Sequence, residues 1–131
     1  MRRLYALIVV VMLGALGVPL FGTPIIVVAD ETARTVSAYD SNGVFRFLLT
    51  PPTGDGTYGL PTAAAFSPDG TEIWVSDFYT DTIYEFSSQG VYRRSFSSSA
   101  ISHPVGLVFN GNNLVVTNRD NNPSTGHIGN N

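Results

Sequence analysis

The amino-acid sequence predicts an all-β protein built from repeated units of four short antiparallel strands. Two observations lead to this prediction. The chain matches itself when it is shifted by 41 to 47 residues, and turn sequences divide each repeat into short runs rich in β-branched and aromatic residues. After residue 22, no segment carries an apolar stripe at helical spacing that is long enough to form a helix.

The N-terminal segment is predicted to lie outside the repeats. Arg2 and Arg3 precede an apolar run of fifteen residues, Leu4 to Val18. This order is typical of a secretory signal peptide, and an uncleaved membrane anchor is the alternative. We therefore assign residues 1–22 to a hydrophobic helix that serves as a signal peptide or N-terminal membrane anchor. We expect a secreted or extracytoplasmic protein, in the periplasm or at the cell surface, whose domain spans residues 23–131.

The composition excludes several classes of function. Beyond residue 22 the chain has ten acidic side chains against five arginines, and it contains no lysine. Nucleic-acid binding requires a basic surface that displaces counterions from phosphates, so we expect no nucleic-acid partner. The sequence also contains no cysteine, which excludes disulfides, thiolate metal sites and thiol nucleophiles.

Self-alignment sets the boundaries of the repeats. At a shift of 47 residues, the segment 26–46 aligns without a gap with 73–93, and eight of the 21 positions are identical. At shifts of 43 and 41 residues, Pro61 aligns with Pro104 and Gly70 with Gly111. The repeats are therefore expected at about 25–60, 61–103 and 104–131, the last of them partial.

The central repeat predicts four strands, Thr62–Phe66, Glu72–Asp77, Thr82–Phe86 and Val91–Phe96, and Gly-containing turns separate the first from the second and the third from the fourth. Four short antiparallel strands within 40 to 50 residues form the unit of a β-propeller blade. The first repeat lacks an obvious first strand, because the apolar N-terminal segment stands in its place. The chain thus holds about two and a half blades, whereas a closed propeller needs roughly 4–8. We expect an incomplete propeller whose open faces promote self-association.

The residues that carry a family resemblance lie in the central and last repeats. The segment 61–70 followed by 73–77 is a proline, a small apolar strand, an Asp-Gly turn and an aliphatic strand ending in Asp77. This order resembles the NHL repeat, and Leu114 to Asn118 is similar to the related YVTN-type repeat. Lactonase-like six-bladed propellers are a third related group. The sequence departs from the NHL pattern at Phe78 to Thr82, where NHL repeats usually carry Asn and Arg.

The resemblance implies an N-terminal fragment of a secreted propeller that serves as a non-catalytic binding or scaffold module. Its ligand would be a protein or a carbohydrate, and no cofactor is implied. The alternative is a fragment of a metal-dependent lactonase- or lyase-like enzyme, for which Ca²⁺ or another divalent cation would be needed. No catalytic residue is predicted from the sequence. A truncated gene product is a further hypothesis.

Three polar residues end equivalent strands: Asp30, Asp77 and Asn118. They are weak candidates for metal ligands, because lactonase-like propellers place such residues around a central cation. Their recurrence at one phase of every repeat favours a structural role instead, in which each side chain caps the following turn. We therefore predict no metal site from them.

Residues that break the repeat are better candidates for binding. Phe78 and Tyr79 occupy a loop in which the other repeats carry charged and polar residues, and exposed aromatic side chains are typical contact residues. His103 stands where the preceding repeat has Leu60. We predict that these three residues contact a ligand, with His103 a candidate for the central face of the propeller.

Overall fold

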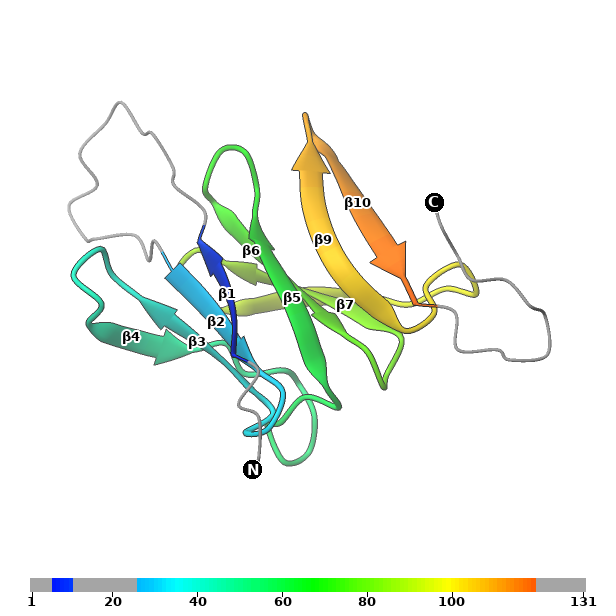
Figure 1. Ribbon diagram of the computed structural model, residues 1–131, viewed down its shortest axis with the longest axis horizontal. Helices are drawn as coiled ribbons and strands as arrows, with labels where there is room; N and C mark the ends of the chain where they lie inside the picture. Colours follow the sequence, from blue (N-terminus) through cyan, green and yellow to red (C-terminus); the bar gives the residue numbers. More distant parts are fainter. Residues whose placement is uncertain (1–5, 11–25, 120–131) are drawn as a thin grey trace.

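The computed structural model describes residues 6–10 and 26–119, and these form three antiparallel sheets packed face to face (Figure 1). The first sheet has the order β1-β2-β3-β4, with β1 Ala6–Val10, β2 Ile26–Asp30, β3 Thr35–Tyr39 and β4 Phe45–Leu48. The second has the order β5-β6-β7-β8, with β5 Pro61–Phe66, β6 Glu72–Asp77, β7 Thr82–Ser87 and β8 Tyr92–Phe96. The third pairs β9 Pro104–Asn110 with β10 Asn113–Asn118.

The all-β prediction is confirmed, and the four strands of the central repeat lie within one residue of their predicted bounds. Local turn chemistry explains this agreement. The amide of Gly70 donates to the carbonyl of Ser67, and the amide of Gly90 donates to that of Ser87, closing the two tight turns that separate β5 from β6 and β7 from β8. Both glycines have positive φ, which side chains other than glycine rarely adopt.

The N-terminal apolar segment differs from the helix expected there. Ala6–Val10 forms strand β1, which pairs antiparallel with β2 from Ala6 opposite Asp30 to Val10 opposite Ile26. The β-branched run Ile8 to Val10 suits a strand, and the open edge of β2 supplies a partner for its backbone. This strand fills the first-strand position that the sequence left vacant. The remainder of the predicted signal segment lies outside the described residues.

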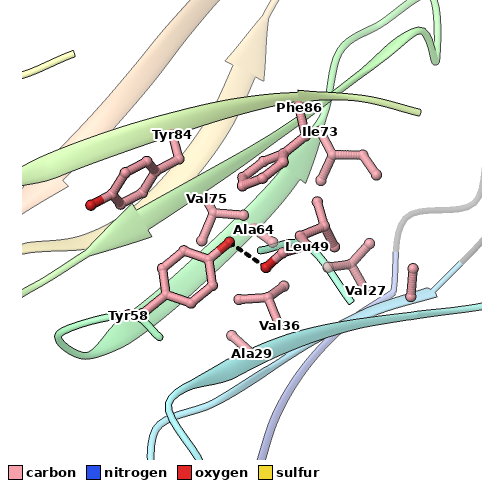
Figure 2. Packing of buried hydrophobic residues seen from close by; sticks show 11 residues of the cluster. Val27, Ala29, Val36, Leu49, Tyr58, Ala64, Ile73, Val75, Tyr84 and Phe86 are labelled. Atoms are coloured by element: carbon pink, nitrogen blue, oxygen red, sulfur yellow. Dashed lines mark hydrogen bonds between the residues drawn. The ribbon is translucent and has the colours of Figure 1, made fainter. Parts of the chain in front are cut away.

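The main hydrophobic core lies between the first and second sheets (Figure 2). Small aliphatic side chains of β2 and β3 face larger ones of the second sheet, and Tyr58 fills the gap at one end with its hydroxyl 2.9 Å from the carbonyl oxygen of Leu49. The buried cluster comprises Val27, Ala29, Val36, Ala38, Leu49, Tyr58, Ala64, Ile73, Val75, Tyr84 and Phe86.

The third sheet covers the opposite face of the second. β9 contacts both β5 and β6, and Phe109 packs edge-on against Trp74 with ring centroids 6.3 Å apart. A polar contact joins the same sheets, because the Thr62 hydroxyl donates to the carbonyl oxygen of Pro104. The three sheets therefore form a stack in chain order, with the second sheet between the first and the third. Within the described ranges 6–10 and 26–119, no helix has the length and hydrophobicity needed to span a membrane.

Candidate functional site

The three polar residues that end equivalent strands have different partners. Asp30 accepts hydrogen bonds from the amides of Thr32 and Ala33, both at 2.8 Å and both through Oδ1, within the turn that follows β2. Asp77 is fully buried and accepts from the amides of Gly59 and Leu60 at 2.7 and 2.8 Å. These two amides belong to the loop that enters the same sheet, so Asp77 ties the end of β6 to the start of β5.

Asn118 makes a contact like that of Asp77 with the polarity reversed. Its Nδ2 donates at 2.7 Å to the carbonyl oxygen of Ala100, in the loop that leads into the third sheet. Among the described residues, no three side chains of the His, Asp and Glu types come together as a group able to hold a metal ion. The side chains of Asp30, Asp77 and Asn118 therefore serve backbone contacts in this structure.

The residues that directly follow these three strand ends meet at one pocket. Glu31, Phe78 and Arg119 stand at the same phase of successive repeats and come from the first, second and third sheets. The repeat thus delivers an acidic, an aromatic and a basic side chain to a single place. The pocket has a volume of about 420 Å³ and is lined by Glu31, Leu60, Thr62, Phe78, Tyr79, His103, Val105 and Arg119.

All three residues predicted as ligand contacts line this pocket. Tyr79 is 68% exposed, and its ring packs edge-on against Phe78 with centroids 5.4 Å apart. The exposure expected of Phe78 was wrong, because its ring is buried between Tyr79 and His103, with a centroid distance of 4.7 Å to the histidine ring. The aromatic wall of the pocket therefore runs from an exposed tyrosine through a buried phenylalanine to a histidine.

The backbone of His103 is held on both sides. Its amide donates to Asp81 Oδ1 at 2.6 Å, and its carbonyl oxygen accepts from the amide of Arg119 at 2.9 Å. Its φ is +48°, in the left-handed region that non-glycine residues rarely adopt. The ring Nδ1 lies 3.2 Å from the hydroxyl of Ser102. This strained and doubly anchored position fixes the imidazole at the pocket wall.

Opposite charges face the pocket without a salt bridge inside the described part of the chain. Glu31 and Arg119 take part in none of the ion pairs found among residues 26–119, and none of those pairs involves a residue that lines the pocket. An arginine guanidinium recognises carboxylates through paired N–H donors, and a glutamate accepts from ammonium and hydroxyl groups. The pocket can therefore bind a ligand that carries both a donor and an acceptor group.

Sequence reasoning did not select Glu31 and Arg119 as site residues. Each is a charged residue in a polar loop, where charged residues are common, so neither stands out from its neighbours in the sequence. The available signal was positional: three equivalent loop positions carry Glu, Phe and Arg, although most other positions of the repeat are conservative. Loops at one end of a blade carry recognition, so divergence at that phase indicates a binding surface.

No protein-family model matches the chain, and no curated protein matches its sequence. Among solved structures, the chain is similar to a catalytically inactive histidine-to-alanine variant of virginiamycin B lyase from Staphylococcus aureus, crystallised with quinupristin. The match has a TM-score of 0.60 at 20% identity and covers 74% of this chain and 32% of that one. At this identity the likeness concerns the fold alone. The chain therefore folds as part of a β-propeller and spans about a third of the length of that solved propeller.

Proposed function

We propose that the chain is an extracytoplasmic, non-catalytic propeller module that binds a short peptide segment of a partner protein in the pocket between its three sheets. The observation that carries the proposal is the convergence of Glu31, Phe78 and Arg119 from one phase of three repeats. A scaffold alone would have no need for three different chemistries at equivalent positions. A ligand site does, because recognition requires charge and shape that the repeat itself does not encode.

A peptide fits the pocket better than a carbohydrate does. The guanidinium of Arg119 can pair with a peptide carboxylate, and the carboxylate of Glu31 can accept from a lysine or an N-terminal ammonium. Tyr79 offers a large exposed ring that loses little conformational freedom on binding. A neutral sugar could stack on the ring and hydrogen-bond to both side chains through its hydroxyls, but it offers no opposite charge to either of them.

The extracytoplasmic location rests on the N-terminal sequence. Two arginines followed by an apolar run of fifteen residues have the order of a secretory signal, and the absence of cysteine means that the exported chain needs no oxidation to fold. Expression of the full chain followed by N-terminal sequencing of the extracytoplasmic fraction tests this part of the proposal. Retention of the whole chain in the cytoplasm would contradict it.

A peptide array probed with the full chain tests the binding proposal. We expect enrichment of peptides that carry both an acidic and a basic group. Tyr79→Ala and Arg119→Ala should each weaken binding to the best peptide by about tenfold, as expected for loss of an aromatic or arginine anchor. Val91→Ala, at an exposed position outside the pocket, is the matched control and should bind as the parent does.

Two results would contradict the proposal. Equal losses for Val91→Ala and Tyr79→Ala would show that the pocket is not the binding site. Binding to a glycan array but to no peptide would replace the peptide ligand with a carbohydrate.

The alternative function is that of a lyase- or lactonase-like enzyme, and one feature supports it. His103 is held at the pocket wall with a hydroxyl beside its Nδ1, and an imidazole so placed can transfer protons. The fold is shared with a lyase crystallised with quinupristin. Turnover of quinupristin or a simple lactone, with and without added Ca²⁺ or another divalent cation, tests this alternative. Turnover that His103→Gln abolishes would establish the enzyme.

A further inference from the structure

Two outer faces of the sheet stack carry apolar side chains that the described residues leave exposed. We call them the first-end face, on the first sheet, and the last-end face, on the third. The first-end face contains Tyr39 and Phe45, and Phe45 is 53% exposed. The last-end face contains Val108 and Val115, which are 57% and 41% exposed. Large exposed apolar faces mark interaction surfaces.

Each exposed pair repeats a pair that is packed inside the protein. Val108 stands opposite Val115 between β9 and β10, just as Ala65 stands opposite Trp74 between β5 and β6. In the second sheet this pair is covered, because Ala65 is buried and Trp74 packs against Phe109 of the third sheet. The last-end face is therefore equivalent to the face of the second sheet that the third sheet covers.

The first-end face is equivalent to the face of the second sheet that packs against the first sheet. Tyr39 packs edge-on against Phe45 with ring centroids 6.0 Å apart, and Phe86 packs against Tyr92 in the same way at 5.9 Å. Phe86 is fully buried between the first and second sheets, whereas its equivalent Tyr39 is only partly buried. The first-end face is thus the kind of surface that covers the sheet before it.

We propose that copies of this chain associate head to tail, with the last-end face of one copy packed on the first-end face of the next. The two faces are of the complementary kinds that meet where the first sheet packs on the second, so this contact continues an interface that the fold already uses. Pairing two identical faces would instead bring together surfaces that never meet inside the molecule. A head-to-tail contact closes into a ring or grows without limit.

The proposal does not depend on what the pocket binds.

Analytical ultracentrifugation of the full chain with single charge substitutions tests the contact. Val115→Arg disables the last-end face and Phe45→Arg disables the first-end face, and both side chains are exposed, so the fold should tolerate them. Each should raise the concentration of half-assembly by at least about tenfold, because an arginine at the contact would be buried without a partner. Val91→Arg, in a turn of the middle sheet and on neither face, should assemble as the parent does.

Mixing the two disabled variants separates head-to-tail contact from other modes. Val115→Arg retains an intact first-end face and Phe45→Arg an intact last-end face, so the mixture should form a dimer of one copy of each and grow no further. A monomeric parent chain would overturn the proposal. So would a parent-like assembly of either variant alone, since a contact between two identical faces needs only one of them. Val108→Arg provides a second disabled last-end face, and circular dichroism shows whether each variant is folded.

Discussion

The hydroxyl of Thr62 donates a hydrogen bond of 2.6 Å to the carbonyl oxygen of Pro104, 42 residues further along the chain. The bond is buried and joins the first strand of the second sheet to the first strand of the third. The same hydroxyl lies 3.0 Å from Oγ of Ser76, so it connects three strands. Because Thr62 and Val105 both line the pocket, this bond fixes the spacing of two pocket walls.

Thr62→Val should loosen the junction between the second and third sheets. The substitution keeps the shape of the side chain but leaves the Pro104 carbonyl without its donor, which costs about 1–3 kcal/mol in free energy of unfolding. Urea denaturation measures the change. Thr35→Val on β3, where no side-chain hydrogen bond is found among the described residues, is the control and should alter stability by less than about 0.5 kcal/mol. Equal effects of the two would show that the buried bond contributes nothing.

Asp77 and Asp30 should respond differently to replacement by asparagine. Asp77 uses both carboxylate oxygens, one for each of two amides, so an asparagine would turn an NH₂ group towards one of those donors. Asp30 binds both of its amides through Oδ1 alone, which an asparagine oxygen can reproduce. We expect Asp77→Asn to lower the free energy of unfolding by about 2–3 kcal/mol and Asp30→Asn by less than about 1. Thermal and chemical denaturation of the two variants would decide it, and similar losses would contradict this account.

Gly43 and Gly90 occupy equivalent turns with φ of +75° and +82°, yet their surroundings differ. A Cβ at Gly90 would lie 2.5 Å from Cδ2 of Phe47, whereas a Cβ at Gly43 would meet nothing within 4 Å. Gly43→Ala should cost about 1 kcal/mol for the strained backbone alone. Gly90→Ala should cost about 1–3 kcal/mol more, because Phe47 must move from its place beside the core. Calorimetry that ranked the two variants equally would show that Phe47 gives way freely.

Tyr58 should make the protein sensitive to alkali. Burial raises the pKa of this phenol above its ordinary value, and the nearby Tyr84 and Asp77 raise it further. The folded state therefore holds the phenolic proton more tightly than the unfolded chain does. Its contribution to stability is complete below the unfolded pKa of about 10 and is lost progressively as the pH rises above it.

Denaturation curves between pH 8 and pH 11 measure this loss. Tyr58→Phe should be less stable than the parent at neutral pH, because the hydrogen bond to Leu49 is gone, but its stability should fall less steeply above about pH 10. Part of the fall should remain, since burial also raises the pKa of Tyr84. Tyr79→Phe, at an exposed position, should keep the parent profile. A parent-like alkaline slope for Tyr58→Phe would contradict the assignment.

The sequence predicted the strands of the second sheet because their limits are set locally. The turn at 67–70 carries its own hydrogen bonds, and a self-alignment transfers the same pattern to the neighbouring repeats. It did not predict β1, because an apolar run after two arginines has the order of a signal, and the partner strand β2 lies some 20 residues away. The pairing depends on the open edge of β2, and the residues around Ala6–Val10 carry no local signal that such an edge is available.

Phe78, Tyr79 and His103 stood out in the sequence because they break the repeat, and all three line the pocket; their contact with a ligand stays a prediction. Glu31 and Arg119 became site residues only through the stacking of three sheets, which brings equivalent loops to one end. The partners of Asp77 were equally hidden, since Gly59 and Leu60 lie 18 and 17 residues before it and come beside it only when β5 pairs with β6.

The residues of strand β1 cannot both stay in the first sheet and be removed as part of a cleaved signal peptide. The five residues Ala6–Val10 complete the first sheet, and they also lie inside the apolar run that the sequence predicts as an export signal. A chain that folds early hides its export signal in the sheet, whereas a chain that is exported and cleaved arrives without that strand and with the edge of β2 uncovered. Export with cleavage would therefore leave the first sheet one strand short, with the backbone edge of β2 open to another strand.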